Sequence, residues 1–464
     1  MILFRRTSLI AVLAASLTVA GCSTVSRLNP FGGGDDEPQE VASEGERIPI
    51  VGAESGVEVT EAIAGQDFNL PAPTPRADWP LPGGAPEQAV EHVDAGQGLS
   101  VAWRQRFGEG SERGKHVTAP PIVADGKVFV MDGTANVSAR DAQSGREIWR
   151  TELRSTNRRD REAFGGGLAY ADGKVYVTSG YRLVVQLDAA TGAVGWRRET
   201  EQPVHGAPTI AGGRVMAVSI DNTLLTFDAA TGEPSWTYQA LTEPARILAA
   251  SSPAVSGDTV VAAFGSGELV ALRVANGNDL WAEALSRASR TTALSEIRDI
   301  PGRPVIYQGD VYAVSHSGVF AAVDLRTGTA RWTLPVTGIT TPWPAGDVVY
   351  VVSKAGEVIC VNRDSGQVYW IRNLNEGIEQ DAGGGGFFGF FERRGNVRPI
   401  WSSPLLASNR LVLVSSGGRL VALNPKTGAV EHSMNIGSPA MLAPIAAGGT
   451  VYVVTDEAEL IALR

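Results

Sequence analysis

The sequence predicts an all-β protein, an eight-bladed β-propeller made of four-stranded antiparallel blades. From residue 99 to residue 464 the chain repeats one pattern of short apolar strands separated by glycine turns, with about 46 residues per repeat. The strands are nearly continuous in apolar residues, which indicates burial on both faces, as in blades stacked around an axis. Eight second strands can be counted, beginning near Val128, Val175, Val215, Val260, Val311, Val348, Leu411 and Val451.

The first 21 residues are typical of a bacterial signal peptide. A basic start is followed by an apolar stretch at residues 9–20, which is too short and too rich in small residues for a transmembrane helix. Residues 19–22 (VAGC) fit a lipobox, so we expect lipidation of Cys22; ordinary cleavage beside an incidental cysteine is the alternative. Ser23 in place of aspartate favours the periplasmic face of the outer membrane.

Residues 22–98 differ in composition from the repeats. They include three consecutive glycines, an acidic run and many prolines between residues 71 and 82. Such a segment has little apolar surface to bury, so we expect a disordered linker. A flexible coil of this length would reach roughly 50 Å from the lipid anchor.

One turn motif, DxxTGxxxW in its fullest form, recurs seven times. The Asp or Asn accepts backbone hydrogen bonds of the turn, and the Gly supplies a positive φ. The Trp is large enough to wedge against a neighbouring blade. Six repeats carry this structural tryptophan, namely Trp149, Trp196, Trp236, Trp281, Trp332 and Trp370, and the seventh has His432.

The eighth repeat stops at Arg464, before its turn and outer strand. Residues 100–104 (SVAWR) resemble the Trp-bearing strand of the other repeats. We therefore expect this N-terminal strand, with Trp103, to complete the last blade and close the ring, which removes the open sheet edges.

Charge and composition exclude several classes of function. A net charge of -10 argues against nucleic acid as a partner, because such partners require a clustered basic surface. Cys360 is the one cysteine besides Cys22, and its apolar neighbours predict a buried thiol rather than a reactive one. No local catalytic or metal-binding motif is present, so we expect no catalytic residue, no metal and no cofactor.

Departures from the repeat are the candidate binding sites. Residues 241–252 are inserted between repeats three and four, and residues 284–302 between repeats four and five; these two loops should lie side by side. They either form a protein interface or pack onto their own blades. A third insertion, residues 375–399, holds glycines and phenylalanines at 383–391. It is either an exposed apolar loop that binds a partner or the membrane surface, or a loop that folds back over the propeller.

The DxxTGxxxW units resemble the quinoprotein-type repeat, whose enzyme members bind pyrroloquinoline quinone and calcium. This chain lacks the adjacent cysteine pair found in many of those enzymes. With its lipobox, eight repeats and closing strand, it resembles instead the BamB (YfgL) family of outer-membrane assembly factors. The long acidic linker and the phenylalanine-rich insertion depart from shorter members.

The BamB resemblance implies a non-catalytic scaffold lipoprotein of the β-barrel assembly machinery. It would bind the POTRA domains of BamA, other lipoproteins of the machinery and, as clients, unfolded outer-membrane proteins. The family uses the loops between blades three and four and between four and five, whose matching positions here are Arg246, Ile247, Leu248, Arg298 and Asp299. The family's leucine-rich stretch is rearranged here, and its second acidic residue is replaced by Pro301. The alternative function is a periplasmic quinoprotein dehydrogenase.

Overall fold

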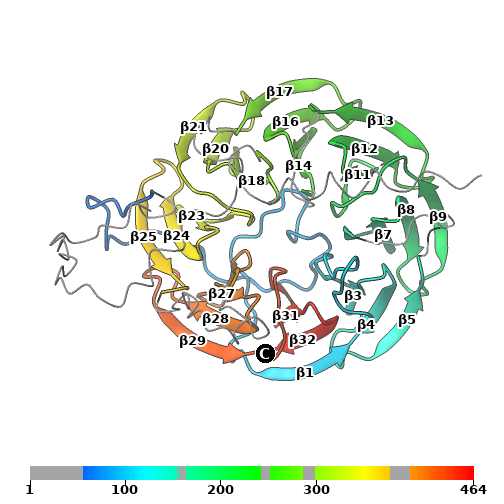
Figure 1. Ribbon diagram of the computed structural model, residues 1–464, viewed down its shortest axis with the longest axis horizontal. Helices are drawn as coiled ribbons and strands as arrows, with labels where there is room; N and C mark the ends of the chain where they lie inside the picture. Colours follow the sequence, from blue (N-terminus) through cyan, green and yellow to red (C-terminus); the bar gives the residue numbers. More distant parts are fainter. Residues whose placement is uncertain (1–55, 154, 156–163, 242–250, 286–297, 377–397) are drawn as a thin grey trace, which may run out of the picture. The chain divides into compact units, whose positions relative to one another are not determined.

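The strands form eight four-stranded antiparallel sheets arranged as blades around an axis (Figure 1), which confirms the predicted β-propeller. The computed structural model describes residues 56–153, 155, 164–241, 251–285, 298–376 and 398–464. Residues 52–464 belong to one compact unit. None of the described residues forms a helix that is long and apolar enough to cross a membrane.

Each of the first seven blades is a continuous stretch of chain, with its first strand nearest the axis and its fourth at the rim. The strands of the first four blades are, in blade 1, β2 (Ile122–Ala124), β3 (Lys127–Met131), β4 (Val137–Asp141) and β5 (Glu147–Thr151); in blade 2, β6 (Gly166–Ala171), β7 (Lys174–Ser179), β8 (Leu183–Asp188) and β9 (Val194–Glu199); in blade 3, β10 (Thr209–Ala211), β11 (Arg214–Val218), β12 (Thr223–Asp228) and β13 (Pro234–Gln239); and in blade 4, β14 (Ala254–Ser256), β15 (Thr259–Ala263), β16 (Glu268–Arg273) and β17 (Asp279–Ala284). The next three blades are made, in blade 5, of β18 (Val305–Tyr307), β19 (Asp310–Val314), β20 (Phe320–Asp324) and β21 (Ala330–Leu334); in blade 6, of β22 (Trp343–Ala345), β23 (Val348–Val352), β24 (Glu357–Asn362) and β25 (Val368–Asn373); and in blade 7, of β26 (Leu405–Ala407), β27 (Arg410–Val414), β28 (Arg419–Leu423) and β29 (Val430–Asn435). Blade 8 contains β30 (Ile445–Ala447), β31 (Thr450–Val454) and β32 (Glu459–Leu463), and its outer strand is β1 (Val101–Arg106).

The ring is closed by pairing between its two ends, as predicted. Strand β1 runs antiparallel to β32, and Trp103 lies opposite Ala462 in the register. Beyond the strands, the backbone amides of Ser100 and Arg464 each donate to the other residue's carbonyl at 2.9 Å. Closure gives blade 8 four strands like the other blades, so β32 is not left unpaired at the seam.

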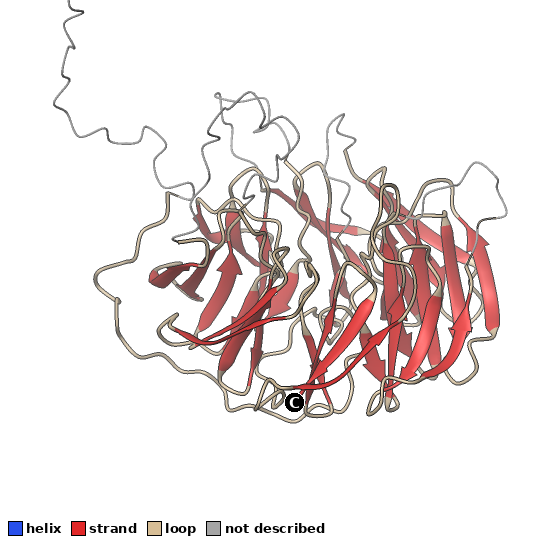
Figure 2. Ribbon diagram, turned by 60° about the horizontal axis from the view of Figure 1, so that its bottom comes forward, coloured by secondary structure: helices blue, strands red, loops and turns tan. Residues whose placement is uncertain are grey.

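Antiparallel blades give the propeller two different faces (Figure 2). One face carries the hairpins between the first and second strands and the DxxTG turns between the third and fourth; we call it the turn face. The opposite face, the loop face, carries the connections from the outer strand of one blade to the inner strand of the next. All three insertions noted in the sequence are connections of the loop face.

Neighbouring blades are joined by tryptophans that lie over the turn glycines of the next blade. A Cβ atom added to any of these glycines would approach a tryptophan ring to 2.5–2.9 Å. Six of the indole N–H groups also donate to a carbonyl of the next blade at 2.7–3.2 Å. The tryptophans predicted to be structural are Trp103, Trp149, Trp196, Trp236, Trp281, Trp332 and Trp370, and they lie over Gly145, Gly192, Gly232, Gly277, Gly328, Gly366 and Gly428, respectively.

The one repeat without tryptophan is explained by the seam. His432 on β29 faces blade 8, whose outer strand comes from the other end of the chain. Blade 8 therefore has no DxxTG turn, and no turn glycine lies there to receive an indole ring.

The turn aspartates act as the sequence predicted. The Oδ1 atom of Asp188 accepts hydrogen bonds from the Thr191 amide at 3.1 Å and from its hydroxyl at 2.9 Å. Asp228 and Asp324 bond their turn threonines in the same way. The repeated carboxylates are therefore occupied by turn backbone, which is a structural role.

The prediction of a disordered linker is wrong for residues 56–98. Trp79 is 1% exposed and Val93 is fully buried, and this segment crosses the middle of the ring (Figure 1). The physical reason is that the eight inner strands present unpaired backbone groups to the axis. Residues 76–93 bond every blade, through contacts with Val123, Tyr170, Thr209, Val255, Ile306, Trp343, Leu406 and Gly448.

The ordered N-terminal segment also contacts hairpins of the turn face. The amide of Asn69 bonds the Asp347 carboxylate in the hairpin between β22 and β23, and Val93 accepts from Ser408 in the hairpin between β26 and β27. The sequence had suggested a free tether of residues 23–98, and residues 23–55 of that segment lie outside the described residues.

Candidate partner-binding face

The two loops predicted to form an interface are neighbours at their described ends. The connection from β13 to β14 ends beside the connection from β17 to β18, where the Ser251 hydroxyl donates to the Gly302 carbonyl at 3.1 Å. At the other ends, the Leu241 amide bonds the Glu268 carboxylate at 3.1 Å, and the Leu285 amide bonds the Gly267 carbonyl at 2.8 Å. Both connections therefore flank blade 4 on the loop face.

Of the five residues predicted to contact a partner, two are described. Arg298 is exposed at the loop face, whereas Asp299 is 2% exposed and its carbonyl accepts the His316 amide at 2.8 Å. Arg246, Ile247 and Leu248 lie outside the described residues, as does the expected lipidation site Cys22. The partner role of all five stays a prediction.

The loop face also exposes apolar side chains. Leu241, at the start of the connection between blades 3 and 4, is 66% exposed. Ile400 and Met441, in the connections that lead into blades 7 and 8, are exposed as well. Leu241 and Arg298 thus offer an apolar group and a positive charge on either side of blade 4, a combination that suits a protein contact.

The third insertion has a firmly tied base. The Asn375 side chain donates to the carbonyls of Ala355 and Pro399 at 2.9 and 3.1 Å and accepts the Trp401 indole N–H at 2.9 Å. The phenylalanine-rich residues 383–391 lie outside the described residues, so both hypotheses for that loop stay open.

The described residues contain no group of three or more His, Cys, Asp or Glu side chains placed to hold a metal ion. Cys360 is buried in β24, and burial raises the pKa of its thiol well above the usual range. That environment favours the neutral, unreactive thiol, as the sequence predicted.

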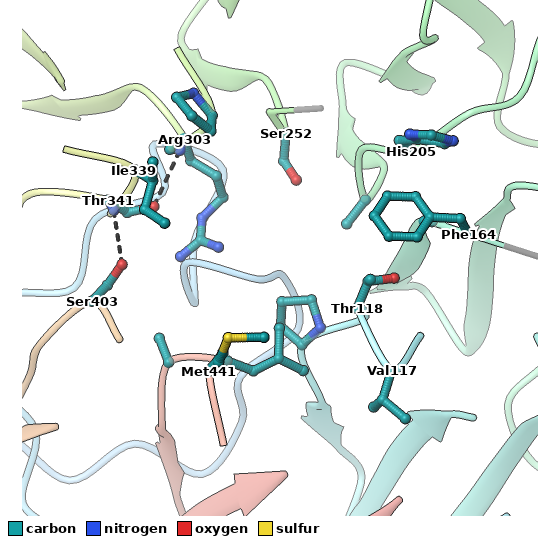
Figure 3. Close-up of a pocket in the computed structure, with 18 residues that line it drawn as sticks. Val117, Thr118, Phe164, His205, Ser252, Arg303, Ile339, Thr341, Ser403 and Met441 are labelled. Carbon is teal, nitrogen blue, oxygen red and sulfur yellow. Dashed lines mark hydrogen bonds between the residues drawn. The ribbon is translucent and has the colours of Figure 1, made fainter. Parts of the chain in front are cut away.

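A site that sequence reasoning missed is a cavity of about 300 Å³ at the propeller axis (Figure 3). Residues from all eight loop-face connections line it, and Arg303 extends into it. Arg303 lies one residue beyond the insertion that the sequence analysis marked. The available signal was the repeat itself, since the aligned positions of the other blades carry no charge.

The chain is similar to known proteins over most of its length. A family model described as outer membrane protein assembly factor BamB matches residues 86–163, 155–372 and 392–464. The outer membrane protein assembly factor BamB of Alkalilimnicola ehrlichii is 28% identical over 384 residues, which cover 82% of this chain and 93% of that protein.

Two solved structures illustrate the fold. BamB from Moraxella catarrhalis superposes with a TM-score of 0.65 at 18% identity, covering 78% of this chain and 99% of that one. The quinohemoprotein alcohol dehydrogenase from Comamonas testosteroni gives a TM-score of 0.63 at 15% identity, covering 83% and 80%. At such identities these structures support the propeller fold and nothing beyond it.

Proposed function

Since this chain belongs to the outer membrane protein assembly factor BamB family, we propose that it is a non-catalytic accessory factor in the assembly of outer-membrane β-barrel proteins. Its partners on this proposal are the POTRA domains of BamA, other lipoproteins of the same machinery, and unfolded outer-membrane proteins as clients. Its place is the periplasmic side of the outer membrane, where acyl chains on Cys22 hold it.

The observation that carries the partner-binding proposal is the difference between the two faces. The inner strands and hairpins at the centre of the turn face are bonded by the chain's own residues 76–93, which reach every blade. The loop face keeps an exposed Leu241 and an exposed Arg298 on either side of blade 4. On this proposal a partner docks on the loop face, through residues 241–252 and 284–302.

The point at which the described chain begins supports the same orientation. The Thr60 amide donates to the Val368 carbonyl at 2.9 Å, so the described chain begins beside the start of β25, at the turn face. The chain therefore enters the propeller at the face opposite to the proposed partner surface.

Asp299 and Arg298 have different parts in this proposal. The exposed Arg298 contacts the partner, and the buried Asp299 holds the end of the loop in place. Substitution of Asp299 should therefore lower thermal stability as well as binding, whereas substitution of Arg298 should lower binding alone.

The test is affinity capture from detergent-solubilised membranes with the tagged full-length lipoprotein. Wild-type protein should recover a BamA-like barrel protein, and the double variant Leu241→Asp, Arg298→Glu should recover much less of it at an unchanged melting temperature. Arg326→Glu is the matched control, because Arg326 is exposed on the turn face. Failure of the folded wild-type protein to recover a barrel protein, or equal recovery by the double variant, would contradict the proposal.

A further inference from the structure

The axial cavity has the size and lining of a small-ligand site. Its volume of about 300 Å³ lies at the lower end of the range for such pockets. Its wall is mainly apolar, with Phe164, Ile339 and Met441 among the lining side chains (Figure 3). The hydroxyl-bearing Thr118 and Ser252 also reach the wall. Such a wall accommodates an apolar body and leaves few polar groups to orient it.

The repeat shows which lining residue is exceptional. The residue four positions before the end of the inner strand lines the cavity in seven of the eight blades. The exception is blade 2, where this residue is Gly167 and is not among the lining residues. Six of the seven residues are small or uncharged, namely Pro120, Ala207, Ser252, Thr341, Ser403 and Ala443. The seventh is Arg303. An arginine at a position where every other blade has an uncharged residue is a departure that packing alone does not require.

The backbone that presents Arg303 is held from both sides. Its amide donates to the Thr341 hydroxyl at 3.1 Å, and the Gly302 carbonyl accepts from the Ser251 hydroxyl at 3.1 Å. A Cβ atom at Gly302 would come within 2.4 Å of the Thr340 carbonyl oxygen, so only glycine fits there. Because the backbone of Arg303 is already held in place, less conformational entropy is lost when a ligand binds.

Among the described residues, no acidic side chain pairs with the Arg303 guanidinium. Its Nε atom is buried without a hydrogen-bond partner, and no ion pair to Arg303 occurs within the described ranges. No acidic residue stands among the described residues of the cavity wall, although acidic residues outnumber basic ones in the chain by 50 to 40. Desolvation lowers the pKa of the guanidinium to about 10, which still leaves it charged at neutral pH. Arg303 is half-buried, and a partly desolvated cation without a counter-charge is unfavourable, so an anion in the cavity would relieve that cost.

We propose that the axial cavity binds a small organic monoanion through its carboxylate, with Arg303 as the group that pairs with it and the apolar wall holding its body. One guanidinium matches one carboxylate, because its planar fork of N–H donors fits the two carboxylate oxygens. The carboxylate belongs either to a free small molecule or to the C-terminus of a peptide that enters from the loop face. This ligand site is independent of the partner contact proposed above.

The experiment measures binding of matched acids and amides by calorimetry. The probes are 3-phenylpropionate and its amide, and an N-acetylated tetrapeptide ending in leucine as the free acid and as the amide. They are titrated into the full mature lipoprotein in detergent and into two variants, Arg303→Met and Arg303→Lys. Arg326→Met, on the turn face, is the control for loss of a positive charge elsewhere.

We expect one acid to bind wild type and Arg326→Met about ten- to a hundred-fold more tightly than its amide, the range that a hydrogen-bonded charge provides. Arg303→Met should lose that preference, and Arg303→Lys should keep part of it. Binding of phenylpropionate but not the peptide acid identifies a free small molecule, and the reverse identifies a chain terminus.

Three results would overturn the proposal: equal binding of acid and amide, unchanged acid binding by Arg303→Met, or no saturable binding of either acid at about 10 mM. Displacement of the bound acid by inorganic phosphate would also overturn the proposal, because phosphate contains no carboxylate. A melting temperature of Arg303→Met equal to or above that of wild type shows that the variant is folded, because it removes an unpaired buried charge.

Discussion

Two tryptophans of similar burial allow the contribution of the inter-blade hydrogen bond to stability to be measured separately from that of side-chain packing between blades. Trp149 and Trp196 are 9% and 8% exposed, and each donates its indole N–H to a carbonyl of the next blade at 3.1 Å. The acceptors differ. The Ala189 carbonyl receives no other hydrogen bond from the described residues, whereas the Ala229 carbonyl also accepts from the Tyr176 hydroxyl at 3.2 Å and the Gln186 amide at 2.8 Å.

Replacing each tryptophan by phenylalanine removes the same atoms at both positions. The Trp196→Phe variant should lose about 1 kcal/mol of unfolding free energy, since its acceptor keeps two donors. The Trp149→Phe variant should lose about 2–4 kcal/mol, because a buried carbonyl without a donor adds a penalty of about 1–3 kcal/mol. Urea unfolding followed by circular dichroism gives both values from the midpoint and slope. Equal losses, or a larger loss for Trp196→Phe, would refute this account of the interface.

Three further predictions concern the turns and the core. Gly277→Ala should destabilise the protein more than Gly257→Ala, because both glycines have positive φ (73° and 60°) but only the first would clash, at 2.5 Å, with a tryptophan of the preceding blade; a thermal melt that ranks them oppositely would be inconsistent with the wedge. The hydrogen bond from Lys174 is the main cause that lowers the pKa of Asp188 from 3.8 to about 2, so this carboxylate stabilises the fold above its unfolded pKa and the contribution is lost as the pH falls through about 2. Melting temperatures of wild type and Asp188→Asn should accordingly converge between pH 4 and pH 2, and a gap that stays constant with pH would contradict the assignment. Cys360 should not react with a thiol reagent in the native protein and should react once urea unfolds it, since burial raises its thiol pKa; rapid native labelling would show that β24 opens.

The sequence predicted the propeller because each repeat contains the residues that determine its own turn and its contact with the next blade. An Asp or Asn bonds the turn and a Gly takes positive φ, both within nine residues. The Trp that follows finds a partner glycine at the same place in the next repeat. Such local signals survive in one sequence without any knowledge of distant contacts. The closing strand around Trp103 was found in the same way, by its likeness to the other outer strands.

Residues 56–98 show where local reasoning fails. Their glycines and prolines predicted disorder, since the segment cannot form a core by itself. The closed ring supplies what the segment lacks, namely eight inner strands with unpaired backbone groups and an apolar centre that buries Trp79 and Val93. Order here is a property of the ring and the segment together, so composition alone could not predict it.

The same limit applies to the sites. The sequence located the insertions around blade 4, because an insertion is visible as a break in the repeat. Whether a given side chain in them is exposed, as Arg298 is, or buried, as Asp299 is, depended on packing against other blades. In the sequence, Arg303 is one of many charged residues. Only closure of the ring brings the eight connections together around one axis and places that charge in a cavity whose described wall holds no acidic residue. The distances between blades are fixed by tertiary contacts and not by any local pattern.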